Sequence, residues 1–259
     1  MKIALSIAGF DPSGGAGVLA DIKTFHALGV YGTAIITAMT VQNSSRVDEI
    51  YSIKKGSIHQ QILCLADEFS FDSIKIGMLR NGDNVEEVWD ALQQINHPSI
   101  VLDPVLSSTS GSALLDDEGE SKMIKLMFPL VSLLTPNIPE AESLSGLKIH
   151  NKKDVEKAAV GICKMGVRSV LIKGGHNKDN SDDYLLSPEG QWWFESKRLS
   201  NREIHGTGCT LAAAIAANLA LGCSIETSVS NAKTYINKTI LRSIHVNSDK
   251  SLPNHFPEL

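Results

Sequence analysis

Apolar runs alternate with amphipathic stretches along most of this 259-residue chain, and that alternation limits its fold more than any other feature. The apolar runs, which resemble strands buried in a sheet, cover residues 2–9, 32–42, 73–77, 99–103, 131–135 and 167–173. The stretches with apolar residues at helical spacing cover residues 14–28, 57–69, 84–95, 117–128 and 154–165. Repeated strand–helix pairs predict a three-layer α/β/α fold, in which helices cover both faces of a doubly wound, mostly parallel sheet.

The rest of the chain predicts one domain. Two short runs around 177–183 and 188–190 are typical of a hairpin, and two further helices are expected to begin at Gly208 and Ser224. The sequence contains no internal repeat and no low-complexity linker. We therefore expect residues 1–259 to form a single domain, with the polar tail 248–259 as its least ordered part.

Charge and composition argue against several kinds of partner. Lys and Arg total 24 against 29 Asp and Glu, a net charge of −5 that gives no electrostatic attraction to nucleic acid or anionic membranes. The longest apolar run, 211–221, is shorter than the ~20 residues that cross a bilayer, and the N-terminal run is too short for a secretory leader. The four cysteines have neither disulfide-framework nor metal-ligand spacing. These features predict a cytoplasmic protein with reduced thiols that acts on small molecules.

Polar residues follow nearly every predicted strand. In a doubly wound sheet, ligands bind at the carboxyl ends of the strands, where the winding reverses. The residues at these positions are Asp11, Gln42, Asn43, Met78, Asp103, Asn137, Glu140 and Lys173. We expect their side chains to line one crevice.

A glycine-rich turn, Gly15-Ala16-Gly17-Val18-Leu19-Ala20, follows the first predicted strand and opens a helix. This context matches the dinucleotide-binding fingerprint G-x-G-x-x-A and permits an NAD-binding oxidoreductase. Such a site also uses an acidic residue at the end of the second strand, where this chain has Gln42-Asn43. In the alternative interpretation, the glycines allow a tight turn and close helix–sheet packing, and Asp11 before them can hydrogen-bond a substrate.

Asn137 and Glu140 stand three residues apart at a predicted helix start. Asn137 can simply cap that helix, with Pro139 in its first turn. Alternatively, both side chains face the crevice and hold a hydrated Mg²⁺ together with Asp103, because Mg²⁺ prefers a few oxygen ligands and retained waters. Lys173, which two glycines follow, is a candidate to contact a phosphate.

The strongest local motif is His205-Gly206-Thr207-Gly208-Cys209, which leads into an almost entirely apolar helix. Glycines let a backbone approach a phosphate, and a helix N-terminus directs unpaired N–H groups and partial positive charge at the same point. The motif therefore predicts an anion hole at Gly206, Thr207 and Gly208. The same field should favour the thiolate of Cys209, whereas His205 is interpreted as a polar turn residue.

Seven motifs, in order along the chain, resemble those of the hydroxymethylpyrimidine/phosphomethylpyrimidine kinase family, within the ribokinase-like superfamily. They begin at Ala8, Thr37, Lys75, Asp103, Thr135, Lys173 and His205 and read AGFDPSGGAG, TAMTVQN, KIGML, DPV, TPNIPEAE, KGGH and HGTGCT. The resemblance implies a ribokinase-like fold and a kinase that uses ATP and Mg²⁺. Such an enzyme phosphorylates the hydroxymethyl group of 4-amino-5-hydroxymethyl-2-methylpyrimidine, and then the monophosphate, in thiamine biosynthesis. Pyridoxal kinases carry near-identical motifs, so pyridoxal or pyridoxine is the alternative substrate.

By matching positions, the resemblance also implies a role for each candidate residue. Asp11 and Gln42 would bind the aminopyrimidine, Met78 would line its pocket, Asn137 and Glu140 would act with Mg²⁺ and phosphates, and Lys173 would contact the ATP phosphates. Cys209 would stand where most ribokinase-like enzymes carry an Asp as base, so Cys209 and Lys173 are the predicted catalytic residues, and Asp103 and Glu140 the predicted metal ligands. Thr109 replaces a lysine of many family members, which removes a cation near the site. The resemblance further implies a homodimer.

Overall fold

The structure of the protein is a computed structural model that describes residues 1–96, 98–107, 113–174, 181–196, 199, 203–247 and 250–258. Its large sheet has the strand order β3-β2-β1-β4-β5-β6-β7-β8-β9. The strands of this sheet are β1 (Ile3–Phe10), β2 (Tyr31–Gln42), β3 (Val47–Ser52), β4 (Ser73–Ile76), β5 (Ser99–Leu102), β6 (Leu133–Leu134), β7 (Val170–Ile172), β8 (Asp183–Ser187) and β9 (Gly190–Phe194). Each apolar run predicted from the sequence therefore overlaps one strand.

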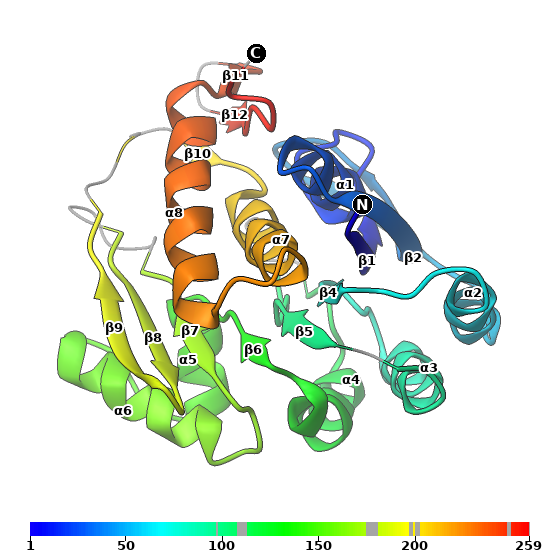
Figure 1. Ribbon diagram of the computed structural model, residues 1–259, viewed down its shortest axis with the longest axis horizontal. Coiled ribbons are helices and arrows are strands. Elements are labelled where there is room, and N and C mark those ends of the chain that lie inside the picture. The colour runs from blue at the N-terminus through cyan, green and yellow to red at the C-terminus, as the bar shows by residue number, and fades with distance from the viewer. Residues whose placement is uncertain are drawn as a thin grey trace.

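The middle of the sheet is parallel and its edges are antiparallel (Figure 1). β2, β1, β4, β5, β6 and β7 run parallel, whereas β3 pairs antiparallel with β2 and the β8–β9 hairpin continues antiparallel from β7. The expected mostly parallel sheet is confirmed. A hairpin is present as expected, but its strands are Asp183–Ser187 and Gly190–Phe194, and residues 188–189 of the second predicted run form its turn. Residues 177–180 of the first predicted run lie outside the described residues. β3 was not expected, because its charged and largely exposed sequence VDEIYS lacks the pattern of a buried strand.

The winding of the chain reverses at β1. β2 lies on one side of β1 and β4 on the other, so the chain crosses back over β1 after β3. The carboxyl ends of β1 and β4 therefore border the crevice in which doubly wound sheets bind ligands. Asp11 directly follows β1, and Gly77-Met78 follows β4.

Helices cover both faces of the sheet, as predicted (Figure 1). One face carries α1 (Gly17–Ala27), α7 (Thr207–Ala220) and α8 (Ile225–Leu241), and the other carries α2 (Ser57–Ala66), α3 (Gly82–Gln93), α4 (Asp117–Lys122), α5 (Ile138–Ser145) and α6 (Lys152–Cys163). The single helix expected over 117–128 is instead α4, a π-helical turn over Met123–Met127 and a 3₁₀ turn over Phe128–Leu130. Pro129 lies in that last turn. Because proline has no backbone N–H, it cannot donate the hydrogen bond that would continue the helix.

Helix α7 occupies the centre of its layer. Alternate strand residues face opposite layers, so Leu5 and Ile7 of β1 pack with the α2–α6 side, whereas Ala4 packs with α7 and α8. Side chains 212–217 of α7 are fully buried, because the helix contacts the sheet on one side and both α1 and α8 on the others. A helix that is apolar on all sides requires such a position. This packing fixes the start of α7 at the carboxyl edge of the sheet.

The C-terminal segment, expected to be the least ordered part of the chain, packs against the body over residues 250–258. β12 (Lys250–Leu252) lies between β10 (Glu203–Ile204) and β11 (Ile244–His245) in a second, small sheet. The imidazole of His255 is buried, with Nε2 at 3.2 Å from Thr210 Oγ1, and the hydroxyl of Tyr235 donates to the His255 carbonyl at 2.7 Å. Among the described residues, no helix combines the length and apolar character needed to span a membrane.

Candidate active site

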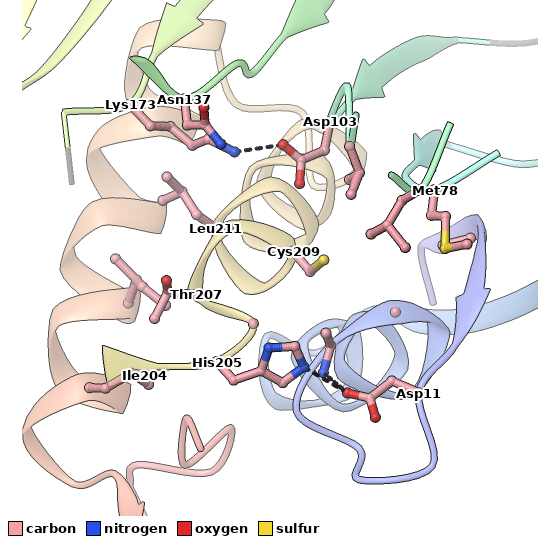
Figure 2. Close-up of a pocket in the computed structure, with 18 of the residues that line it drawn as sticks. Asp11, Met78, Asp103, Asn137, Lys173, Ile204, His205, Thr207, Cys209 and Leu211 are labelled. Carbon is pink, nitrogen blue, oxygen red and sulfur yellow. Dashed lines mark hydrogen bonds and ion pairs between the residues drawn. The ribbon is translucent and has the colours of Figure 1, made fainter. Parts of the chain in front are cut away.

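A cavity of about 760 Å³ opens at the carboxyl edge of the sheet. The loops after β1, β2, β4, β5, β6 and β7 contribute to its walls, together with the start of α7 and one side of α8. The structure brings the residues predicted to bind substrate, phosphate or metal into this lining, namely Asp11, Gln42, Met78, Asp103, Asn137, Glu140, Lys173, Gly206, Thr207, Gly208 and Cys209. Asn43, which was also expected to line the crevice, lies outside the lining, because its side chain accepts from the Ser45 and Arg46 N–H groups in the turn between β2 and β3. In Figure 2, Lys173 and Asp103 lie on one side of the α7 start, His205 and Asp11 lie on the other, and Cys209 lies between them.

Two glycine turns from opposite ends of the chain touch through their backbones. Gly206 has a φ of 88°, and a Cβ on it would lie 1.8 Å from the carbonyl oxygen of Gly15. Gly17 has a φ of 61°, and a Cβ on it would lie 2.2 Å from the carbonyl oxygen of Gly9. Only glycine fits at either position, because both the backbone conformation and the space exclude a side chain. The glycines of the G-x-G-x-x-A motif therefore serve close packing, which favours the structural interpretation over a nicotinamide site.

The starts of α1 and α7 meet at Cys209. The N-cap residues of these helices, Ala16 and Gly206, provide no side-chain hydrogen bond. The backbone N–H of Gly17, at the start of α1, lowers the pKa of Cys209, in the first turn of α7. Uncapped helix starts present unpaired N–H groups and partial positive charge, so the region can hold an anion.

The thiol of Cys209 is nevertheless not shifted toward the thiolate. Burial raises its pKa, and the charges of Asp103 and Asp21 act in the same direction, while Lys75 opposes them. The expectation of a favoured thiolate was therefore wrong, because the loss of solvation outweighs the attraction of Lys75.

Lys173 and Asp103 form an ion pair across the crevice. The ammonium of Lys173 lies 2.6 Å from Asp103 Oδ1, which also accepts a hydrogen bond from Thr135 Oγ1 at 3.0 Å. Burial alone would lower the pKa of Lys173, but the carboxylates of Asp103 and Glu140 raise it above its ordinary value. A Cβ on Gly208 would lie 3.3 Å from Lys173 Nζ, so the ammonium directly faces the first turn of α7. A phosphate held there would meet both the cation and the helix N–H groups.

Asn137 and Glu140 form a capping box at the start of α5. The side chain of Asn137 accepts from the Glu140 N–H at 2.9 Å, and Glu140 accepts from the Asn137 N–H at 2.8 Å. Helix capping is therefore confirmed, yet both residues also line the cavity. Burial raises the pKa of Glu140 to about 7, with a further contribution from the charge of Asp103 and an opposing one from Lys173.

The carboxylates of Asp103 and Glu140 suit a hydrated Mg²⁺. They are close enough for the charge of one to raise the pKa of the other, and both face the cavity. Within the described part of the chain, no group of three His, Cys, Asp or Glu side chains could hold a metal. Mg²⁺ commonly uses one or two carboxylates, several waters and substrate phosphates, so this donor set fits Mg²⁺ better than a metal that needs a complete protein cage.

His205 is a site residue that the sequence analysis missed. Its Nε2 lies 3.1 Å from Asp11 Oδ2 and 3.5 Å from Gln42 Nε2, and the imidazole lines the cavity. Asp11 also accepts from the Ser13 hydroxyl and from the Ala16 N–H. Burial alone would raise the pKa of Asp11, but the hydrogen bonds from His205 and Ser13 hold it below its ordinary value. The available signal was the position of His205 at the head of the strongest motif.

A second missed pair, Lys233 and Asp183, also lines the cavity. The ammonium of Lys233 on α8 bonds to Asp183 at the start of β8 and to the carbonyl of Ser181. The second carboxylate oxygen of Asp183 accepts from the Gly174 N–H at 2.8 Å, next to Lys173. After β4, Met78 forms an apolar part of the lining against Gly9, where a Cβ would lie 2.9 Å from its sulfur. Thr109, Gly175 and His176 lie outside the described residues.

The sheet order and the helix layers agree with the ribokinase-like α/β fold, and the family to which the chain belongs consists of phosphotransferases. The family model for phosphomethylpyrimidine kinase matches residues 11–254. The chain therefore belongs to the phosphomethylpyrimidine kinase family.

Relatives and solved structures agree with this assignment. The hydroxymethylpyrimidine/phosphomethylpyrimidine kinase of Staphylococcus aureus (strain MSSA476) is 37% identical, over 100% of this chain and 95% of that protein. The crystal structure of phosphomethylpyrimidine kinase from Clostridium difficile 630 is 38% identical with a TM-score of 0.83, over 93% of this chain and 100% of that one. The pyridoxal kinase from Staphylococcus aureus in complex with AMP-PCP and pyridoxal is 30% identical with a TM-score of 0.90, over 99% of this chain and 94% of that one.

Proposed function

We propose that this kinase transfers the γ-phosphoryl group of ATP to the hydroxymethyl group of 4-amino-5-hydroxymethyl-2-methylpyrimidine, and then to the monophosphate, in thiamine biosynthesis. The observation that carries the proposal is the placement of the Lys173–Asp103 pair beside the α7 start, in the same cavity as Asp11, Gln42 and Met78. One end of that cavity offers cationic and N–H groups to phosphates, and the other offers hydrogen-bonding groups and an apolar wall to a ring. The named activity of the relatives supports this substrate class.

The chemical step is an in-line displacement at the γ-phosphorus. The substrate hydroxyl oxygen forms a new bond to phosphorus, the bond to the bridging oxygen of ATP breaks, and ADP leaves. Cys209, in its thiolate form, accepts the hydroxyl proton and becomes the neutral thiol. The N–H groups of Gly206, Thr207 and Gly208 stabilise the negative oxygens, and Lys173 balances the phosphate charge. A loose transition state needs positioning and charge neutralisation more than a strong base, so a cysteine is adequate in this role.

Mg²⁺ would be held by Asp103 and Glu140, with Asn137 at the adjacent phosphates, and would supply further charge neutralisation. Removal of divalent ions with EDTA should abolish ADP release, and added Mg²⁺ should restore it. In the Glu140→Gln variant, the Mg²⁺ concentration for half-maximal activity should rise about tenfold or more. An unchanged Mg²⁺ requirement would remove Glu140 from the ion's ligands.

The substrate is tested by coupled ADP-release assays with the hydroxymethylpyrimidine, its monophosphate and pyridoxal. The proposal expects the largest kcat/KM for the hydroxymethylpyrimidine. A larger value for pyridoxal would favour the alternative, which the similarity to pyridoxal kinases supports. Turnover of the pyrimidine but not of its monophosphate would limit the enzyme to the first step, in keeping with Thr109 where many family members have a lysine. NAD binding measured by fluorescence quenching is expected to be absent.

We further propose a single-domain, cytoplasmic homodimer. One sheet includes strands from β1 to β9, and α7 and α8 return to cover it. Met39, Val41 and Tyr51 on the β2–β3 hairpin have about half their surface exposed, at 46%, 44% and 48%, which provides apolar area for self-association. Light scattering coupled to size exclusion should give twice the 27.9 kDa chain mass, and Val41→Asp should shift the protein toward the monomer.

A further inference from the structure

A lysine–aspartate pair is sealed below the cavity, outside its lining. Lys75 of β4 and Asp21 of α1 are both fully buried, and the Lys75 ammonium lies 2.8 Å from Asp21 Oδ2. The hydroxyl of Ser6 donates to the same oxygen at 2.6 Å. Within the described part of the chain, the buried Oδ1 of Asp21 has no hydrogen-bond partner. Apolar residues of similar volume usually stabilise a core as well or better, so a buried pair with an unsatisfied oxygen points to a role beyond stability.

The pair lies below the start of α7, which carries Cys209. Ser73, two residues before Lys75 on β4, donates its hydroxyl to the Ala216 carbonyl of α7 at 2.8 Å, so Lys75 lies nearer the start of that helix. Gly17, which begins α1 and lines the cavity together with Cys209, precedes Asp21 by four residues. Residues four apart lie on the same face of a helix, about 5–6 Å from each other. Lys75 extends from β4 toward the carboxyl edge of the sheet, because a Cβ on Gly77 would lie 2.8 Å from its ammonium. The cation therefore lies behind the wall of the cavity, below the start of α7.

Four charged side chains act on Cys209 from the surrounding elements. Lys75 from β4 and Lys173 after β7 attract negative charge on the sulfur, whereas Asp21 from α1 and Asp103 after β5 repel it. Lys173 is bonded to Asp103 and faces the cavity, where the proposed nucleotide phosphates would engage it. Lys75 has no exposed surface and is not part of the cavity lining, so an incoming phosphate leaves its charge in place.

We propose that Lys75, anchored by Asp21 and Ser6, is a positioning residue that holds a fixed positive charge behind Cys209 and stabilises its thiolate while phosphates occupy Lys173. This proposal rests on the proposed role of Cys209 as proton acceptor. It assigns Asp21 a double role, because its carboxylate holds the Lys75 ammonium in place and limits the effect of that charge on the sulfur. Removing Lys75 should then raise the pH midpoint at which Cys209 ionises, and removing Asp21 should lower it.

The test measures the pH dependence of Cys209 alkylation by iodoacetamide in the full chain without substrate. Tandem mass spectrometry assigns the alkylated residue, because fragment ions distinguish Cys209 from Cys223 on the same tryptic peptide, while Cys64 and Cys163 lie on other peptides. In Lys75→Met, the midpoint should rise by about one pH unit, which lowers the alkylation rate near neutral pH about tenfold. In Asp21→Asn, the midpoint should fall. Lys122→Met is the control, because Lys122 pairs with two carboxylates outside the cavity lining. This variant should leave the Cys209 midpoint unchanged.

Folding of the variants is checked by circular dichroism. If a single variant does not fold, the double variant Asp21→Asn/Lys75→Met keeps the volume and leaves no unpaired charge. Its midpoint should still rise, by less than that of Lys75→Met, because Lys75 has the larger effect on Cys209. Shifts of equal sign in the two single variants, or an unchanged midpoint in the double variant, would overturn the proposal. The readout needs no turnover, so a fully active Cys209→Ala variant would reject the base role of the thiol without affecting the measured shifts.

Discussion

Lys173 and Asp103, separated by 70 positions in the sequence, form an ion pair of 2.6 Å at the point where the first turn of α7 meets the carboxyl edge of the sheet. The Lys173 ammonium and the Asp103 carboxylate therefore lie beside the unpaired N–H groups at the start of α7. The charges of Asp103 and Glu140 raise the pKa of Lys173 and so keep its ammonium protonated. In the proposed reaction, the polyphosphate of ATP would therefore meet a cation that the protein has already placed.

Lys173→Met should lower kcat/KM for ATP by about 10²–10³, because it removes the charge that faces the transferred phosphoryl group and leaves two carboxylates without their partner. ADP release under varied ATP measures this effect. Lys122→Met is the matched control, since Lys122 also pairs with two carboxylates, Glu86 and Glu118, but does not line the cavity. A kcat/KM in Lys173→Met close to that of the control would exclude Lys173 from the reaction.

Cys209→Ala should lower kcat by about 10²–10⁴ while KM changes little, because the proton acceptor is lost and the ring-binding residues remain. Steady-state kinetics with the hydroxymethylpyrimidine separates the two parameters. Cys209→Ser keeps the size of the side chain and isolates the contribution of sulfur. An unchanged kcat in Cys209→Ala would leave the thiol with a packing role.

Gly206→Ala should destabilise the fold by about 3 kcal/mol or more and abolish activity, because its Cβ would collide with the Gly15 carbonyl as well as require a left-handed backbone. Gly222 provides the matched control. Its φ of 89° is nearly the same as the 88° of Gly206, but nothing lies within 4 Å of its Cβ position. Gly222→Ala should cost about 1 kcal/mol, the strain alone. Urea unfolding gives both values, and equal losses would contradict the backbone contact.

Acid should destabilise the protein through His255. Burial lowers the pKa of this imidazole from 6.5 to about 4, and the charge of Lys23 contributes in the same direction. The unfolded chain therefore binds more protons than the folded one between these values, so stability is lost as the pH falls through that window. At pH 5 the loss is about 2 kcal/mol relative to neutral pH. Urea unfolding of the wild type and of His255→Gln at pH 7 and pH 5 measures it.

The comparison between wild type and variant isolates His255 from other titrating groups. Glu140 shifts in the opposite sense, because its raised pKa favours the protonated folded state as the pH falls, but it is present in both proteins. The variant should lose less stability than the wild type between the two pH values. Equal losses would mean that His255 is not neutral in the folded protein.

The sequence predicts the parallel strands and the lining of the cavity because both depend on local patterns. Apolar runs buried on two faces identify β1, β4 and β5, and the rule for carboxyl ends then selects Asp11, Asp103 and Lys173. β3 escaped prediction because an edge strand with charged, exposed residues has no such pattern. The break of the helix after Lys122 depends on tertiary packing around Met123 and Phe128, which are fully buried.

Contacts between single polar residues far apart in the sequence could not be predicted. His205 and Asp11 are 194 positions apart, and Lys75 and Asp21 are 54 apart, so neither pair has a local signature. The protonation of Cys209 was misjudged for a related reason. The helix field can be inferred from the motif, but the depth of burial that raises the pKa depends on how α1, α7 and the sheet pack together.

The contact of Gly206 with Gly15 and of Gly17 with Gly9 also bears on how such enzymes diversify. That seam is made of main-chain atoms, so amino-acid exchange offers no means of reshaping it. A change of substrate would then require exchanges at the side chains beside these contacts, such as Gln42 next to His205 and Met78 against Gly9, which we propose contact the ring.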